Sequence, residues 1–363
     1  MNIVIFNPYG IGNTLLLLPF LSNLKKSYPT ARILMVVTQR VVIDLLDGQG
    51  LIGEFVLYNN SLSPRKSKNG GWLSRIKYAW EMLRLILVIR KKKADILFIL
   101  ESPSVKSALF VWLAKAKECI GHASGTALDC VLSHAVPIAP DAHEVEWRLD
   151  LLRALGHHVA YERPKLRLPV EVCARWATKH AATCNRRPIV GLHPGCSNTL
   201  REKRWPAERF ALLIHVLMKE MELSPILFGG PDDKDVAQLI MNDLDDPIPS
   251  YVNRLDIMNT AGAIANCDLF ISNDSGLMHL AAAVGTPVIA LFGNTSVSKN
   301  APQVDGAIVI VGKEADNSNA VSAITVEEVL VAVKEKLCRQ PDDPVERRQA
   351  EKDINESLVY EIA

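Results

Sequence analysis

The sequence predicts an α/β protein made of two Rossmann-like, doubly wound domains that face a central cleft. The length of 363 residues suits two domains better than one. Short apolar runs alternate with helical patterns in both halves, which is typical of parallel sheets. A stretch without either period separates the halves. We therefore expect a first domain over 1–165, a second over 166–340, and a charged tail over 341–363.

The first half begins with a strand, a glycine loop and a helix. The loop NPYGIGN precedes a segment whose leucines fall on one helical face. Strands are expected at Asn2–Phe6, Ile33–Val37, Phe55–Tyr58, Ile96–Leu100 and near Ile120. After a helix that ends near Gly156, the stretch HHVAYERPKLRLPVE has neither period, and we place the interdomain connection there.

The second half repeats the alternation. Strands are expected at Ile189–His193, Pro225–Phe228, Leu269–Ser272 and Val288–Phe292, and helices are expected to begin at Ala207, Asp232, Gly276 and Thr325. In such a pair of domains, ligands bind between the carboxyl edges of the two sheets.

Composition excludes several classes of function. The 41 basic and 40 acidic residues give a net charge of +1, so no overall field attracts nucleic acid. The seven cysteines are scattered without a C-x-x-C pair, which argues against a zinc site or a disulfide framework. With no basic leader and no run of about eighteen apolar residues, we expect a cytoplasmic protein. We expect no cofactor and no metal site, since Asp243-Leu244-Asp245 suits a solvated helix end.

The segment SNDSGLMHL carries the strongest functional signal. We expect Asn273 and Asp274 to cap the next helix, and Ser275 with Gly276 to open it. Free N–H groups and the helix dipole would then bind a diphosphate, and His279 lies one turn further along. The alternative is an ordinary capped helix with a structural histidine.

Two further loops follow strands of the second half. HPGCSNTLREKRWP supplies Lys203 and Arg204 as cations for a leaving diphosphate; the alternative is a solvated basic loop anchored by Trp205. FGGPDD places Gly229 and Gly230 before acidic residues that suit ribose hydroxyls, although turn glycines after strands are common.

These motifs resemble, in order, the donor-binding motifs of glycosyltransferase family 9, the lipopolysaccharide heptosyltransferases. The matching segments are KRWP, FGG-x-x-D, NDSG-x-x-H and P-V-x-A-L-F-G, together with GIGN and EVEWRLDLLRALG in the first half. The resemblance covers Asn2 to about Leu337. It implies the two-domain GT-B fold and inverting transfer of a heptose or related sugar, without a metal, from ADP-heptose or another nucleotide sugar.

The resemblance also assigns roles to residues. Lys203 would bind the donor phosphates, and the diphosphate and sugar would be held by Asp274, Ser275, Gly276 and His279. The first domain would bind a lipopolysaccharide core or related glycolipid acceptor, with Gly10, Gly12 and Asn13 forming the acceptor loop.

The sequence departs from the family at two positions. Gly293-Asn294-Thr295 replaces the usual G-P-T, and Asn13 replaces the aspartate presumed to be the catalytic base. An amide orients a hydroxyl but cannot accept its proton. Glu101 directly follows an expected strand at the cleft edge, so we infer that it substitutes as the base; the alternative is that it caps a helix starting near Pro103.

Two other functions compete with transfer. One is a descendant of the fold that binds nucleotide but has lost or changed transfer activity, because Asn13 is not a base. The other, a dinucleotide oxidoreductase, is disfavoured because Leu15 occupies the third glycine position of G-x-G-x-x-G and VVTQR lacks the acidic ribose ligand.

The segment from Pro64 to Lys93 is strongly basic. It contains many lysines and arginines but one acidic residue, Glu81, and its basic residues are interleaved with Trp72, Tyr78 and Trp80. This pattern suits an anionic membrane surface or a phosphorylated glycolipid, and we expect salt-sensitive, peripheral association with the inner face of the cytoplasmic membrane. The alternative is a core-packed helix with a solvated basic face.

Overall fold

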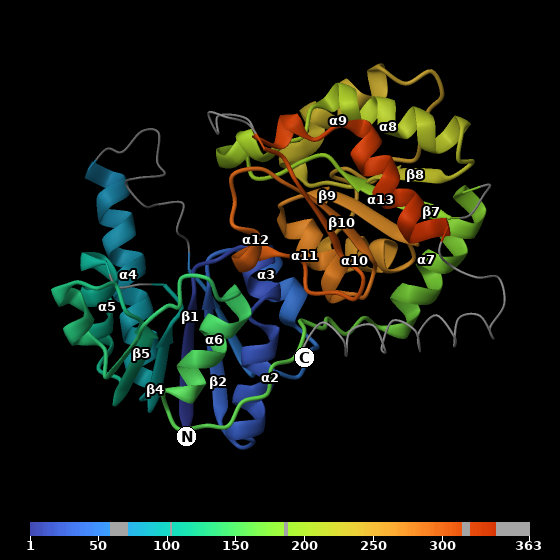
Figure 1. The fold of residues 1–363 in the computed structure, drawn as a ribbon. Helices are drawn as coiled ribbons and strands as arrows, with labels where there is room; N and C mark the ends of the chain where they lie inside the picture. The colour runs from blue at the N-terminus through green and yellow to red at the C-terminus, as the bar shows by residue number, and fades with distance from the viewer. Residues whose placement is uncertain (59–71, 102–103, 185–187, 314–319, 339–363) are drawn as a thin grey trace, which may run out of the picture.

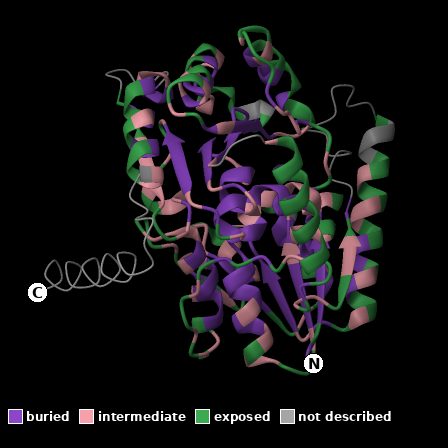
Figure 2. Ribbon diagram, turned by 90° about the vertical axis from the view of Figure 1, so that its right-hand side faces the viewer, coloured by how far each residue is buried: buried purple, intermediate pink, exposed green. Residues whose placement is uncertain are grey.

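Two parallel sheets form the protein, as a computed structural model shows for residues 1–58, 72–101, 104–184, 188–313 and 320–338 (Figure 1). The predicted fold class is confirmed. Helices flank both sheets, and most strand residues are buried (Figure 2). No helix within these ranges is both long and apolar enough to cross a lipid bilayer.

The first sheet has six strands in the order β3-β2-β1-β4-β5-β6. Its strands are β1 (Asn2–Asn7), β2 (Arg32–Val37), β3 (Glu54–Leu57), β4 (Ile96–Ile99), β5 (Glu118–His122) and β6 (His134–Val136). The associated helices are α1 (Ile11–Leu15), α2 (Leu18–Ser27), α3 (Arg40–Leu46), α4 (Trp72–Lys92), α5 (Val105–Ala114) and α6 (Glu144–Arg153). Parallel pairing sets Phe6 beside Ile99, so the loops after β1 and β4 leave the same edge.

The second sheet has five strands in the order β11-β10-β9-β7-β8. Its strands are β7 (Ile189–His193), β8 (Ser224–Leu227), β9 (Leu269–Asn273), β10 (Val288–Phe292) and β11 (Ile308–Val311). The longer helices are α7 (Val170–Thr183), α8 (Ala207–Lys219), α9 (Lys234–Asn242), α10 (Ile257–Ala265), α11 (Gly276–Ala283) and α13 (Val326–Cys338), and α12 (Val297–Asn300) is short.

Strand order places the candidate loops at the topological switch points. In each sheet, successive strands are first added on one side of the starting strand and then on its other side. The change of side lies between β1 and β4 in the first sheet and between β7 and β9 in the second. Ligands of doubly wound sheets bind outside the carboxyl ends of such strands. The loops that follow these strands begin with Pro8, Leu100, Pro194 and Asp274.

The two halves meet through helices. The segment 157–169 has neither helix nor strand and leads into α7. Across the halves α1 packs against α11, and α3 packs against α10. One buried cluster joins residues of both halves, including Leu149 and Ala281, whereas a cluster beneath α4 and α5 contains first-half residues alone among those described. The domain limits given above stay a prediction.

Candidate functional site

The amino end of α11 is capped differently from the prediction. Ser275 is the N-cap, and its hydroxyl accepts a hydrogen bond of 3.3 Å from the Met278 N–H. Asn273 is instead the last, buried residue of β9; its amide donates to the carbonyl oxygens of Pro194 and Gly195 at 2.9 and 3.3 Å. The predicted caps Asn273 and Asp274 were therefore wrong, because the strand continues one residue further and uses Asn273 to fix the loop after β7.

Lys203 and Asp274 form an ion pair at this helix end. The Lys203 Nζ lies 2.6 Å from the Asp274 Oδ2, and the side chains are 21% and 8% exposed. Lys203 ends a 3-10 turn (Asn198–Lys203) after β7, whereas Asp274 follows β9. The pair therefore joins two predicted motifs and keeps an ammonium beside the positive end of α11, where an anion would be stabilised by both.

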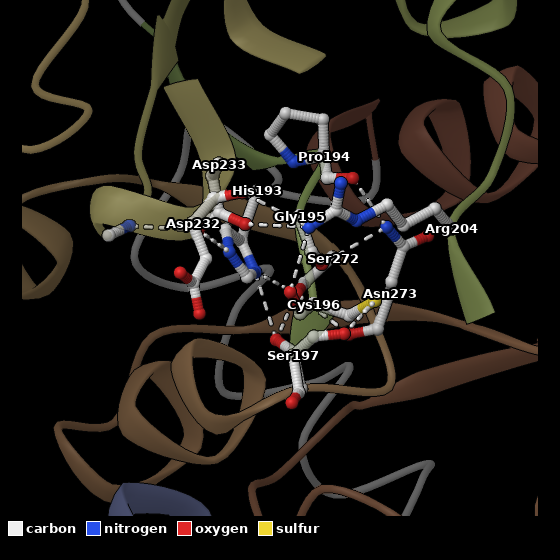
Figure 3. A network of polar contacts seen from close by, with 12 residues as sticks. His193, Pro194, Gly195, Cys196, Ser197, Arg204, Asp232, Asp233, Ser272 and Asn273 are labelled. Carbon is white, nitrogen blue, oxygen red and sulfur yellow. Dashed lines mark hydrogen bonds and ion pairs between the residues drawn. The ribbon is translucent and has the colours of Figure 1, made fainter. Parts of the chain in front are cut away.

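His193 links Ser275 to Asp233 inside the same site. Figure 3 shows His193 beside Asp233 and Ser272. The His193 Nδ1 lies 2.9 Å from the Ser275 Oγ and its Nε2 lies 3.2 Å from the Asp233 Oδ2. His193 and Asp233 are buried and Ser275 is partly buried at the carboxyl edge of the sheet. Burial opposes ionisation of Asp233, but His193, the Gly230 N–H and Arg204 together lower the pKa of this carboxyl.

The Asp233 side chain occupies the space beside two glycines, where a Cβ atom would clash with it. A Cβ atom added to Gly195 would lie 1.8 Å from the Asp233 Oδ1, and one added to Gly229 would lie 2.9 Å from its Cβ. The Gly230 N–H donates to the Asp233 Oδ2 at 2.8 Å. Gly195 and Gly229 thus leave room for the buried Asp233 carboxylate, while Asp232 beside it is exposed to solvent.

Arg204 holds the loops of the site together. Its Nη2 donates to the carbonyl oxygens of Cys196 and Asp232 at 3.0 and 3.2 Å and lies 3.5 Å from the Asp233 Oδ1 (Figure 3). The side chain is 13% exposed. Arg204 therefore supplies positive charge from within the loop, whereas Lys203 is the more exposed cation. Trp205 is fully buried, and its indole N–H donates to the Ile324 carbonyl at 2.8 Å.

The glycine loop of the first half touches the site. A Cβ atom added to Gly12 would lie 3.0 Å from the His279 Cδ2 and 3.3 Å from the Gly276 Cα. His279 is 6% exposed, and among the described residues its Nδ1 has no hydrogen-bond partner. A buried nitrogen without a partner is costly unless a ligand supplies one.

His279 is expected to stay neutral at every pH from about 5 to 8. Burial lowers the pKa of this imidazole from 6.5 to about 4, against the smaller opposing effect of Asp274. Because the unfolded chain takes up a proton that the folded site refuses, this group should cost stability as the pH falls from 6.5 towards 4. Imidazole chemical shifts, assigned by comparison with His279→Gln, provide the measurement; titration of His279 near pH 6.5 would contradict the expectation.

Glu101 and Asn13 occupy the first-half side. Asn13 lies half-buried in α1. Glu101 follows β4, and burial raises the pKa of its carboxyl. It lies near Tyr9, whose hydroxyl donates to the Leu100 carbonyl at 3.0 Å. The helix after it is capped by Ser104 with Ser107, so Glu101 is not the cap of α5, while Pro103 lies outside the described residues.

The charge of Arg148 acts on residues of both halves, Tyr9 in the first and His279 in the second. Arg148 is 4% exposed on α6, and its guanidinium carbon lies 5.8 Å from the centre of the Tyr9 ring. Its Nη2 lies 2.8 Å from the Glu144 Oε2. Its charge acts against protonation of His279 and favours ionisation of Tyr9, although burial raises the pKa of Tyr9 on balance. Arg148 is therefore a buried cation that contacts Tyr9 of the glycine loop and acts electrostatically on His279 of α11.

His193 and Arg148 were not among the predicted site residues, and Asp233 was predicted only as one of the acidic residues of FGGPDD that suit ribose hydroxyls. His193 ends β7, so the rule that selected Glu101, a polar residue at the carboxyl end of a central strand, would also have selected His193. Asp233 and Arg148 stand in the quoted motifs, but no sequence signal indicates that their side chains turn inward.

A cavity of about 1100 Å³ also lies between the halves. It borders the carboxyl end of α11 at Ala282 and Ala283 and the connecting segment at Tyr161–Arg167. The predicted site residues lie at the other end of α11, so this cavity is separate from the site.

Comparison with known proteins points to one family. The model of glycosyltransferase family 9 (heptosyltransferase) matches residues 82–329. Lipooligosaccharide heptosyltransferase 2 of Haemophilus influenzae is 35% identical over 136 residues, which are 36% of this chain and 39% of that protein. Lipopolysaccharide heptosyltransferase 3 of Escherichia coli is 26% identical over 290 residues, 78% of this chain and 80% of that protein. The match thus spans about two fifths of the Haemophilus relative.

A solved structure shares the whole fold. That of E. coli ADP-heptose lps heptosyltransferase II superposes with a TM-score of 0.75 at 23% identity, covering 94% of this chain and 99% of that one.

Proposed function

Since the chain belongs to glycosyltransferase family 9 (heptosyltransferase), we propose that it is an inverting sugar transferase. The donor is a nucleotide diphosphate sugar, ADP-heptose or a relative, and the acceptor is a lipopolysaccharide core or related glycolipid. The names of the Haemophilus and E. coli relatives support this substrate class.

One observation carries the proposal. The Lys203 ammonium and the amino end of α11 lie together at the switch point of the second sheet, with the Asp274 Oδ2 2.6 Å from the Lys203 Nζ. Fixed positive groups at this point suit a diphosphate that gains charge as it leaves. We assign Ser275, Gly276 and His279 to the donor as well, with Gly229, Gly230 and Arg204 shaping the loops around it.

The reaction needs one displacement and one proton transfer. An acceptor hydroxyl attacks the anomeric carbon, the bond from that carbon to the diphosphate oxygen breaks, and the configuration inverts. The hydroxyl proton passes to a carboxylate, which we assign to Glu101, while the Asn13 amide orients the hydroxyl beside Gly10 and Gly12. Lys203 and α11 stabilise the departing diphosphate.

The competing function is nucleotide binding without transfer. The observation in its favour is Asn13, which cannot act as a base. Both functions need the same donor site, so turnover distinguishes them. We further propose that the protein works in the cytoplasm, peripherally on the membrane that holds its glycolipid acceptor.

ADP and ADP-sugars should raise the thermal midpoint of the protein, because a ligand that binds only the folded state stabilises it. At about a hundredfold excess over Kd the gain is about 2.7 kcal/mol, a shift of a few degrees for a chain of this size. Thermal shift with ADP, UDP, GDP, NADH and the corresponding sugars is the measurement. No shift with any nucleotide diphosphate would remove the donor site, and a shift with NADH alone would favour an oxidoreductase.

A further inference from the structure

Helix α4 exposes an apolar stripe. Its members follow one another at helical spacings of four, four, three and four residues, so they share one face; they are Trp72, Ile76, Trp80, Leu83 and Leu87. Trp72 is 70% exposed and Trp80 is 65% exposed. The opposite face packs on the first sheet through Leu85, Ile86 and Ile89. The stripe is thus additional to the face that the fold needs.

Helix α5 repeats the arrangement. Val105, Leu109 and Trp112 are exposed and lie on one helical face, with Trp112 68% exposed. Phe110, Val111 and Ala114 are buried on the other face. Trp112 is a large aromatic side chain, and the packing of this short helix on the sheet does not explain why it is exposed to water.

The two stripes point the same way. Helices α4 and α5 pack against each other, and their buried faces enter the same hydrophobic cluster with Leu97 and Ile99 of β4. Because each stripe lies opposite its buried face, both stripes point away from one face of the first sheet. That cluster contains first-half residues alone among those described, and Figure 1 shows α4 and α5 apart from the second sheet. We call the two stripes together the α4/α5 face.

Basic residues border this face. Lys77, Arg84 and Lys91 on α4 are exposed and lie along one flank of the stripe, while α5 carries no acidic residue. Helix α4 has one acidic residue, Glu81, whose Oε2 lies 3.5 Å from the Arg84 Nη1. Because its lysines and arginines outnumber this one carboxylate, the helix has a net positive charge. Exposed tryptophans beside lysines and arginines are typical of helices that lie in the headgroup region of a bilayer.

We propose that the α4/α5 face inserts into the headgroup region of an anionic phospholipid membrane and docks the protein there. Charge complementarity selects this occupant, since lysines and arginines would meet lipid phosphates. In a symmetric dimer through the same face they would instead meet their own copies. The proposal thus gives the predicted association of Pro64–Lys93 with anionic lipid a contact surface, and this surface extends to α5. Residues 59–71 of that segment lie outside the described ranges.

This inference deepens the proposed function and rests on its membrane-held acceptor. Helices α4 and α5 cover the side of the first sheet that takes no part in the contacts of α1 with α11, and the α4/α5 face points away from it. Docking there leaves the amino end of α11 free to receive a soluble donor. Insertion adds a salt-resistant contribution to the salt-sensitive association expected above, because tryptophan burial survives salt that screens exposed charges.

Flotation of the full chain with phospholipid vesicles, without donor or acceptor, tests the proposal. The wild type should float with vesicles of phosphatidylcholine and phosphatidylglycerol, and less with phosphatidylcholine alone. The combined change Trp72→Ser, Trp80→Ser and Trp112→Ser should lower the bound fraction at least tenfold. The combined change Lys77→Gln, Arg84→Gln and Lys91→Gln should remove the preference for anionic lipid.

The matched control replaces equally exposed apolar residues elsewhere, Val170→Ser, Leu239→Ser and Val331→Ser, and should float like the wild type. Far-ultraviolet circular dichroism checks folding of each variant. Undiminished flotation of the tryptophan variant, equal loss in the control, absence of wild-type flotation, or a wild-type dimer dispersed by the tryptophan changes would overturn the proposal. Transfer to a detergent-dispersed acceptor is measured separately: flotation without transfer rejects the proposed function, and transfer without flotation rejects the docking.

Discussion

Replacing Lys203 with alanine is expected to lower kcat about a hundredfold to a thousandfold while the protein stays folded. The ammonium is partly exposed and lies beside the amino end of α11, so its loss removes a preorganised group that stabilises the leaving diphosphate. Removal of one such group typically costs about 3 kcal/mol of barrier. Asp274→Ala should cause a loss of similar size, because Asp274 positions the ammonium at 2.6 Å. Steady-state kinetics with the nucleotide sugar identified by thermal shift is the measurement.

A matched control for Lys203 exists on the surface of the same half. Lys219 forms an ion pair with Asp246 at the same distance, 2.6 Å, but both side chains are about half exposed. Exposed pairs contribute little to stability, so Lys219→Ala should leave kcat and the thermal midpoint almost unchanged. Near-normal turnover of Lys203→Ala, or an equal loss in Lys219→Ala, would rule out the proposed donor site.

Replacing Glu101 with glutamine is expected to lower the rate about a hundredfold or more, the usual contribution of a positioned base. Burial raises the pKa of this carboxyl, so the wild-type rate should fall as the pH falls through that raised pKa. The rate falls towards low pH because the base must be ionised to accept a proton. Glu101→Gln should lose that acidic limb along with the rate, and a pH series of kcat measures both.

The companion variants for Glu101 are Asn13→Asp and Glu118→Gln. Glu118 begins β5 at the amino edge of the same sheet, so its replacement should be silent. If Glu101→Gln is silent as well and Asn13→Asp creates activity that the native chain lacks, the chain binds nucleotide without transferring sugar. If Asn13→Asp raises an existing rate, the amide and Glu101 share the task.

The apolar runs of the central strands were sufficient to predict most of both sheets. Strands β7 and β10 have the predicted limits, because their residues are buried on both faces and read as continuous apolar runs. Strand β6 has three residues and strand β11 is only partly buried, so neither gives that signal. Both were absent from the prediction.

Helices α7 and α10 were missed for a different reason. Their sequences were part of stretches interpreted as a connection or left unassigned. Gly262 lowers the helix propensity of α10, yet a Cβ atom there would lie 2.5 Å from the Val172 Cγ1 of α7. The glycine is required by the close packing of the two helices, a tertiary demand that propensity cannot report.

The candidate site shows the same division. Strand ends and glycine loops predicted where Lys203, Ser275 and Glu101 would lie, because topology brings carboxyl edges together. The sequence did not predict that Asp233 turns inward to His193, or that Asn273 stays in the strand. Those outcomes depend on side-chain packing around Gly195 and on hydrogen bonds to Pro194, which link segments far apart in the chain.

The contact between Gly12 and Gly276 has a consequence for the timing of the reaction. With so little space between α1 and α11, we expect the glycine loop to cover a diphosphate bound at Ser275. The donor must then enter before the halves come together, and the nucleotide product leaves only after they separate. We therefore expect each turnover to contain one closing and one opening of the two halves. A larger side chain at position 12 would hold the halves apart, weakening retention of the donor and hastening escape of the product.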